Sequence, residues 1–292
     1  MNVHSVEIRT VETIIVPLDG SPMAEDALEP ARTLADAFGA RIELVAATDH
    51  RSDANSVQSV EQYLHGLADS LRPFDVGTHH QTGDPDRAIL ERVHAFPGPL
   101  VCMTTRGHTG IGAMLLGSVT ERVVRSVSGP ILMIGPTFEG ASSGFRGNRL
   151  VFAFDGSDAS AAAIGVAMEW AQRLHLDIRV VMVLHHDGTF LADTDATEGR
   201  QRAHELVRRL REEGHCAEVA FLDGIEPARA IAADASHHDV AIVVAASHDH
   251  SRLVGSTLGN VTTRLAHHCP CPVLVVRPTP ADDTSSEGVH GS

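Results

Sequence analysis

Short, mostly apolar runs alternate along the chain with longer stretches in which apolar positions recur at helical spacing. The early runs occupy 13–18, 41–48 and 99–103, and each is followed by polar or charged residues. Continuous apolar runs of strand length are typical of strands covered on both faces, as in a parallel sheet, whereas alternation indicates a half-exposed sheet. The pattern therefore predicts parallel strands that are joined by helices.

The second half of the chain repeats the element order of the first half. In both halves an apolar run ends in Asp-Gly-Ser, at 19–21 and 155–157, and leads into an alanine-rich stretch. The later segments also correspond pair by pair: 41–48 with 177–184, 81–90 with 221–231, 99–105 with 239–247, and 115–136 with 257–278. Self-similarity of this kind indicates a tandem duplication.

Each copy is predicted to contain five strands that alternate with helices. Right-handed crossovers between parallel strands give a doubly wound α/β sheet. The sequence thus predicts two tandem Rossmann-like domains, each with a mainly parallel five-stranded sheet. The first covers 1–136, a Gly- and Ser-rich linker covers 137–148, and the second covers 149–278. The polar tail at 279–292 is predicted to be disordered.

The charge of the chain narrows the classes of partner. The formal net charge is −15, and all 23 basic residues are arginine. Because an acidic protein repels phosphate backbones and anionic lipids, we expect neither a nucleic acid nor a membrane as partner. Because the sequence contains no lysine, it excludes a Walker-type P-loop, a protein kinase site and a Schiff-base enzyme.

The first residues of the chain and its cysteines indicate the cellular compartment that we expect. The chain opens on the polar segment MNVHSVEIRT and has no apolar run of membrane-spanning length, so we expect a cytoplasmic protein with free thiols. Cys269 and Cys271 flank Pro270, next to His267 and His268. This cluster could hold a metal, but its spacing differs from common zinc sites, so buried thiols are the preferred interpretation.

Residues with binding chemistry follow the ends of the predicted strands. Asp19 follows the first strand, Ala47 and Thr48 end the second, and Met103 to Gly107 follow the fourth. The glycine-rich segment RGHTGIGAMLLGS, at 106–118, then leads into a helix. Ligands of open α/β sheets bind beyond the carboxyl ends of the strands, so we expect a site here.

The glycine-rich segment is interpreted as an anion-binding loop. Gly107 and Gly117 would let the backbone approach a ligand, and the following helix would direct its free N–H groups and positive dipole end at an anion. Ser118 and Thr120 would add hydroxyl donors. The alternative is a capping box, in which Ser118 caps the helix and Glu121 reaches back to it.

Asp19 has two compatible interpretations. As a helix cap, its carboxylate would accept hydrogen bonds at the start of the helix near Pro22. As a ligand contact, it would accept hydrogen bonds from an adenine amino group or from ribose hydroxyls. Since strand-end caps line the same crevice, one carboxylate can do both.

These motifs make the chain resemble the universal stress protein family, as two family domains in tandem. The Asp-Gly-Ser of 19–21, the Gly-x-Pro of 83–85 and the closing strand PILMIGP match the family pattern. The family loop, G-x2-G-x9-G-[ST], reads here as Thr104-x2-Gly107-x9-Gly117-Ser118. The loop departs from the family form at its first glycine, where Thr104 stands.

The resemblance implies an ATP-binding, Rossmann-like domain that dimerises through its last strand. Asp19 would face the adenine and ribose, and Pro17, Ala47 and Met103 would line the base pocket. The residues implied to hold the ribose and phosphates are Thr104, Gly107, Gly117, Ser118, Val119 and Thr120. The implied ligand is ATP, with or without Mg²⁺.

The second copy departs further from the family loop. With Gly259 aligned to the last loop glycine of the first copy, the other motif positions are Ala246, Asp249 and Asn260. Asp249 would repel a phosphate at a cost on the order of a few kcal/mol, against about −8 kcal/mol for micromolar binding. We therefore expect nucleotide mainly in the first domain, although the second keeps Asp155.

Two classes of function compete. One is a nucleotide-dependent stress or regulatory module without catalytic residues; the other is an enzyme, such as a slow ATPase. Phosphoryl transfer needs a cation and a group that positions the nucleophile, and the loop offers only Arg106 and His108, so a binding module is preferred. A cyclic-nucleotide sensor would use the same base pocket. We expect the two domains to pair through their last strands as a pseudo-dimer, and the chain to form a homodimer.

Overall fold

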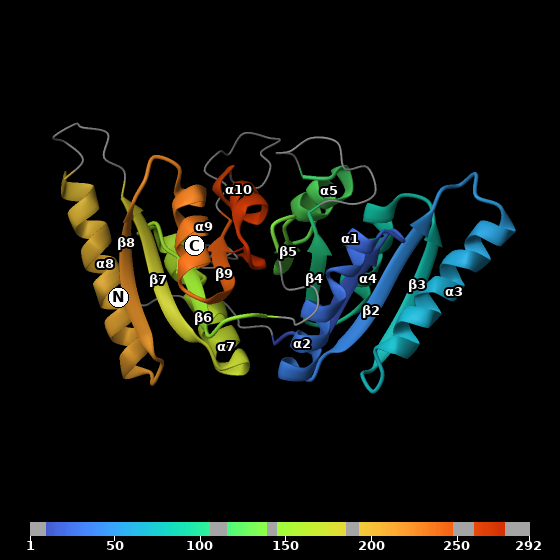
Figure 1. The fold of residues 1–292 in the computed structure, drawn as a ribbon, viewed down its shortest axis with the longest axis horizontal. Helices are drawn as coiled ribbons and strands as arrows, with labels where there is room; N and C mark the ends of the chain where they lie inside the picture. The colour runs from blue at the N-terminus through green and yellow to red at the C-terminus, as the bar shows by residue number, and fades with distance from the viewer. Residues whose placement is uncertain (1–9, 106–115, 139–144, 185–192, 248–259, 278–292) are drawn as a thin grey trace, which may run out of the picture.

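The computed structural model describes residues 10–105, 116–138, 145–184, 193–247 and 260–277 (Figure 1). The first copy contains strands β1 (Thr13–Leu18), β2 (Arg41–Thr48), β3 (Val76–Thr82), β4 (Pro99–Thr104) and β5 (Ile131–Ile134). Its helices are α1 (Pro22–Glu25), α2 (Leu28–Phe38), α3 (Ala54–Ser70), α4 (Pro85–Ala95) and α5 (Ser118–Ser126).

The second copy has the same element order. Its strands are β6 (Arg149–Ala153), β7 (Asp177–Leu184), β8 (Ala217–Asp223), β9 (Val240–Ala246) and β10 (Val273–Val276). Its helices are α6 (Asp158–Ala162), α7 (Ile164–Leu174), α8 (Asp193–Glu212), α9 (Pro227–His237) and α10 (Asn260–His268). The predicted tail at 279–292, and 139–144 of the predicted linker, lie outside the described residues.

All these strands join one 10-stranded sheet, in the order β3-β2-β1-β4-β5-β10-β9-β6-β7-β8. Neighbouring strands within each copy are parallel. The copies meet where β10 runs antiparallel to β5, with Leu274 opposite Leu132. The predicted fold class, tandem Rossmann-like α/β units with mainly parallel strands, is confirmed.

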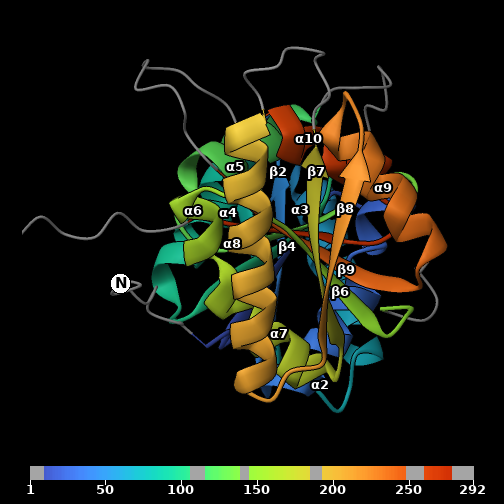
Figure 2. The same cartoon turned by 90° about the vertical axis from the view of Figure 1, so that its left-hand side faces the viewer.

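Helices cover both faces of the sheet. Helices α2, α3, α7 and α8 bury one core against alternate strand residues such as Ile14 and Leu150, and α4, α5, α9 and α10 bury the other against residues such as Ile15 and Val151. Figure 2 shows α8 and α9 on opposite sides of β7 and β8. This double cover explains the continuous apolar runs, because inner strands such as β5 are buried on both faces.

The copies also contact each other through helices on the first face. Phe38 of α2 and Trp170 of α7 lie with their ring centroids 5.3 Å apart. Trp170 is the sole tryptophan of the chain and is 1% exposed. Its fluorescence therefore reports on the contact between the copies. None of the described helices is long and apolar enough to cross a bilayer.

The first helix of each copy is interrupted, which the sequence pattern does not predict. In the first copy α1 stops at Glu25, and the amides of Asp26 and Ala27 donate to carbonyls only three residues back. Pro30 lacks an N–H and so could not donate to the carbonyl of Asp26 in an unbroken helix. In the second copy Ala163 makes the same kind of turn, donating to Ser160 over 3.1 Å.

Candidate functional site

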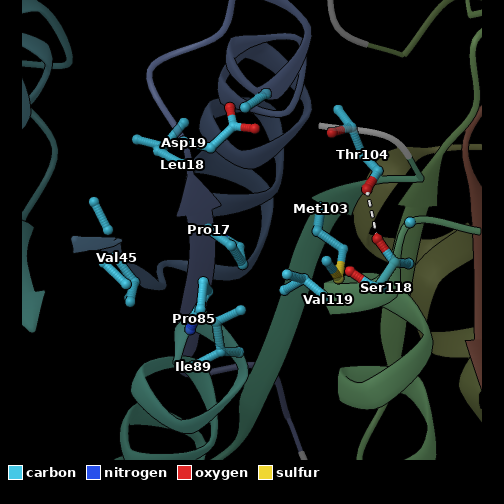
Figure 3. Close-up of a pocket in the computed structure, with 15 residues that line it drawn as sticks. Pro17, Leu18, Asp19, Val45, Pro85, Ile89, Met103, Thr104, Ser118 and Val119 are labelled. Atoms are coloured by element: carbon cyan, nitrogen blue, oxygen red, sulfur yellow. Dashed lines mark hydrogen bonds between the residues drawn. The ribbon is translucent and has the colours of Figure 1, made fainter. Parts of the chain in front are cut away.

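A pocket of about 280 Å³ opens at the carboxyl ends of β1, β2 and β4, beside α4 and α5 (Figure 3). Its lining residues are Pro17, Leu18, Asp19, Ala24, Val45, Ala46, Ala47, Pro85, Ile89, Met103, Thr104, Gly117, Ser118, Val119 and Thr120. The structure thus brings together all the residues predicted for the site that it describes. Gly107 lies outside the described residues, as do Arg106 and His108.

The middle of the pocket is apolar. Figure 3 shows Asp19 and Ser118 on different sides of the side chains of Pro17 and Met103. Two further apolar residues, Val45 and Ile89, were not predicted for the site. The apolar middle suits a flat, weakly polar group such as a base, since apolar walls with few polar groups are the usual lining of ligand pockets.

The missed lining residues share a simple relation to predicted ones. Val45 lies two positions before Ala47 on the same face of β2, and Ile89 lies one helical turn after Pro85, which belongs to the Gly-x-Pro motif. Both residues could therefore have been predicted, Val45 from the two-residue period of a strand and Ile89 from the i,i+4 spacing of a helix. Leu18, Ala24 and Ala46 also line the pocket and carry no such signal.

The Asp-Gly-Ser segment after β1 forms a tight turn at one end of the pocket. Gly20 has a φ of +78°, in the left-handed region that favours glycine. Asp19 Oδ1 accepts hydrogen bonds from the Ser21 amide at 3.0 Å and the Ser21 hydroxyl at 2.5 Å. Ser21 Oγ in turn accepts the Ala24 amide at 3.2 Å. The prediction that Asp19 itself caps the helix is therefore wrong: Ser21 is the cap, and Asp19 orients it.

The start of α5 lines another part of the pocket. Gly117 is the N-cap and Ser118 is the first helical residue, so the alternative interpretation, a capping box at Ser118, is wrong. Glu121 does not reach back to the helix start, because its carboxylate pairs with Arg125 over 2.6 Å. The first-turn amides, from Ser118 to Thr120, have no carbonyl of their own helix to bond and lie at the pocket.

The hydroxyl of Thr120 is engaged within the protein. It donates to the carbonyl of Thr104 over 3.3 Å, drawn as the dashed line in Figure 3, and Thr120 is 3% exposed. This bond ties the start of α5 to the end of β4. Ser118, by contrast, is exposed at the pocket and offers a hydroxyl to a ligand.

The turn end of the pocket has one lining carboxylate, Asp19, and a second carboxylate, Glu25, lies on the adjoining helix α1. Asp19 is the one charged residue among the lining residues described, and none of them is cationic. Tyr63 of α3 donates to Glu25 of α1 over 2.9 Å. Burial, this hydrogen bond and the charges of Glu25 and Asp19 raise the pKa of Tyr63. Tyr63 therefore stays protonated and holds α3 against α1 beside the pocket.

A family model described as the universal stress protein family matches residues 10–135 and again 147–277. The chain belongs to the universal stress protein family. A universal stress protein of Mycolicibacterium smegmatis is 27% identical over 237 residues, covering 77% of this chain and 78% of that protein. The crystal structure of a universal stress protein from Archaeoglobus fulgidus covers 91% of this chain and 98% of its own, with a TM-score of 0.71 and 19% identity. A universal stress protein solved in complex with cAMP covers 43% of this chain at 22% identity, and its TM-score of 0.37 is too low to bear on the ligand here.

In this universal stress protein the second Asp-Gly-Ser turn is built like the first. Gly156 has a φ of +84°, and Asp155 Oδ1 accepts the Ser157 amide at 2.9 Å and the Ser160 hydroxyl at 2.6 Å. The matching turns show that this aspartate has a structural role in both copies, whatever else Asp19 does.

The surroundings of the two turns differ. Nothing lies within 4 Å of a Cβ built at Gly20, whereas one at Gly156 would lie 3.3 Å from Met182 Cε and 3.4 Å from the backbone of Gly199 in α8. Arg202 of α8 also donates to the Gly156 carbonyl and pairs with Asp158 over 2.6 Å. Helix α8 thus covers the second turn. Asp249, predicted to repel phosphate, lies outside the described residues.

The cysteines of the CPC motif are core side chains. Cys269 and Cys271 are buried, and none of the four cysteines, all described, forms a disulfide. A hydrogen bond with Cys271, followed by burial, raises the pKa of the Cys269 thiol. Within the described ranges, no group of three or more His, Cys, Asp or Glu side chains is placed to hold a metal ion.

Proposed function

We propose that this universal stress protein binds an adenine nucleotide, ATP in the first place, in the pocket of its first copy and acts as a regulatory module in the cytoplasm. One observation carries the proposal: a carboxylate and a helix N-terminus line a single pocket at separate places, with apolar side chains also lining it. An adenine nucleotide has the matching order of groups, because its base and ribose offer hydrogen-bond donors and its phosphates are anionic.

Each part of the pocket suits one part of the nucleotide. Pro17, Ala47 and Met103 would contact the base, and Asp19 would accept hydrogen bonds from the ribose or adenine. The phosphates would lie at Gly117, Ser118 and Val119, where backbone amides and the helix dipole favour an anion without a lysine. Mg²⁺, if bound, would be held by the phosphates, because Asp19, which lies apart from the start of α5, is the one lining carboxylate described.

We propose binding without efficient catalysis. Phosphoryl transfer depends on cations that neutralise the transferring group, and the described lining residues include none. Slow hydrolysis and cyclic-nucleotide sensing are the competing functions. A turnover assay separates the first, since enzymes typically reach about 1 s⁻¹ or more, and competition of cAMP against ATP separates the second.

Asp19→Ala is expected to weaken ATP binding at least about tenfold, the cost of losing hydrogen bonds to a charged acceptor. Isothermal titration calorimetry measures the affinity, and mass spectrometry of small molecules released on denaturation tests for co-purified ATP. Asp155→Ala is the matched control, because it removes the same turn from the second copy. Its affinity should stay within about twofold of wild type. Equal weakening by both variants would refute a ligand role for Asp19.

Binding is expected to saturate at one nucleotide per chain. Helix α8 covers the second turn through Arg202 and Gly199, whereas the first turn is open. The stoichiometry comes from the same calorimetric titration, with protein concentration fixed by the absorbance of Trp170 and Tyr63. Two equivalent nucleotides per chain would contradict the proposed difference between the copies.

We further propose that the two copies form the pseudo-dimer of the family within one chain. Strands β5 and β10 already pair with each other, over Ile131 to Met133 and Val273 to Val275. Because this pairing uses the last-strand edges, a homodimer of the chain would need another surface.

A further inference from the structure

The chain leaves β5 and β10 in opposite directions. The residues that follow each of these strands contact the last helix of the other copy. Because the strands are antiparallel, Val275 of β10 lies opposite Ile131, the first residue of β5. Helix α5 ends at Ser126, shortly before that strand begins. Residue Arg277, just past β10, therefore arrives at the C-terminal end of α5. Figure 1 shows α5 and β5 on one side of the molecular midline and α10 on the other.

The guanidinium of Arg277 donates to the last carbonyls of α5. Its Nη2 donates to the Val124 carbonyl, and its Nη1 lies 3.4 Å from the Arg125 carbonyl. The Val127 amide closes the last turn on Val123, so the carbonyls that follow have no amide of their own helix. The basic residue of the last turn, Arg125, does not cap the helix because it pairs with Glu121.

The opposite exit makes the reciprocal contact with α10. Thr137, which follows β5, donates its hydroxyl to the Cys269 carbonyl over 2.6 Å. Cys269 directly follows α10, whose last turn also packs against Gly135. Each copy therefore caps the last helix of the other. The two caps differ in charge, because Arg277 carries a cation and Thr137 does not.

We infer that Arg277 is a positioning residue for the nucleotide site of the other copy, an inference that rests on the proposed function. Helix α5 has nine residues, a length of about 13 Å. Its first turn lines the pocket, and a carbonyl of its last turn accepts a hydrogen bond from Arg277. A cation at the C-terminal end stabilises the helix and complements its dipole, which favours an anion at the other end. The second copy thus supports phosphate binding by the first.

The test compares Arg277→Met with Thr137→Val in the full-length protein. Hydrogen–deuterium exchange should be faster in residues 118–127 of Arg277→Met and unchanged in 260–268, and Thr137→Val should show the reverse. Arg277→Met should weaken ATP binding about three- to tenfold and leave adenosine affinity nearly unchanged, because the helix dipole of α5 acts on the charged phosphates, which adenosine lacks. Arg277→Lys, which keeps the cation, should restore most of the ATP affinity, and Thr137→Val should leave it unchanged.

The inference would be overturned by unchanged exchange in 118–127 of Arg277→Met, by equal acceleration in both helices, or by an equal loss of ATP and adenosine affinity. Unchanged ATP affinity in Arg277→Met would do the same. If the wild-type protein bound no nucleotide, the proposed function would fail, and the exchange comparison would still decide whether Arg277 positions α5.

Discussion

Asp234→Ala is expected to lower the free energy of unfolding by about 3 kcal/mol, the lower range for breaking a buried ion pair. Asp234 lies on α9 with its side chain 3% exposed, and both of its oxygens accept hydrogen bonds of 3.0 Å from Arg179 of β7. Hydrogen bonding to Asp234 is the main cause of the raised pKa of Arg179. Alanine would leave this largely buried guanidinium with Glu218 alone, at 2.6 Å.

Urea denaturation, monitored by the fluorescence of Trp170, measures this loss of stability. The control is Glu205→Ala on α8, which also removes one of two carboxylate partners of an arginine, but on an exposed surface: Arg208 pairs with Glu205 at 2.5 Å and with Glu212 at 2.6 Å. Exposed pairs of this kind contribute little, so its denaturation midpoint should match wild type. The interpretation is wrong if the two variants lose equal stability or if Asp234→Ala is as stable as the control.

The first copy has an ion pair at the equivalent place with its signs exchanged. Glu43, the third residue of β2, replaces Arg179, the third residue of β7; Arg92, the eighth residue of α4, replaces Asp234, the eighth of α9. Glu43 is 3% exposed and lies 3.7 Å from Arg92. If α9 docked on the first half of the sheet, its aspartate would meet Glu43. The exchange therefore favours each helix on its own copy, because buried like charges are costly.

Features that repeat along the sequence could be predicted, and contacts between distant segments could not. The strands follow from runs such as 13–18 because burial on both faces leaves a continuous apolar pattern. The pocket residue Asp19 follows from its place just beyond a strand end, and Gly117 from its place at the start of the helix that follows the glycine-rich segment. Asp234 and Arg179, by contrast, lie 55 residues apart, and nothing in either local pattern indicates their pairing.

The sequence pattern also could not predict which of several nearby polar side chains forms a given hydrogen bond. An Asp-Gly-Ser motif offers two side chains that can cap a helix, and only the geometry of the turn assigns the cap to Ser21 and the supporting role to Asp19. Glu121 has a similar choice between the helix start and Arg125, and the cation is its partner in the structure. Such choices depend on differences of about 1 kcal/mol between competing hydrogen bonds, which residue types alone do not decide.

Gly135→Ala is expected to be among the most damaging single-methyl additions in the protein. A Cβ at Gly135, directly after β5, would overlap the carbonyl oxygen of Ala266 in the last turn of α10. The obstacle is backbone rather than a flexible side chain, so β5 and α10 would have to separate. We expect a loss of about 3 kcal/mol, the upper range for overpacking a tight contact. The junction between the copies should loosen first, because Gly135 and Ala266 belong to different copies.

The matched control is Gly66→Ala, the same substitution inside helix α3. Nothing lies within 4 Å of a Cβ at Gly66, so alanine should stabilise the helix by about 0.5–1 kcal/mol through its higher helix propensity. Urea denaturation of both variants, read from Trp170 at the contact with Phe38, should thus give shifts of opposite sign. A Gly135→Ala protein as stable as wild type would mean that β5 and α10 do not pack this closely, and the reciprocal capping by Thr137 and Arg277 would lose its geometric basis.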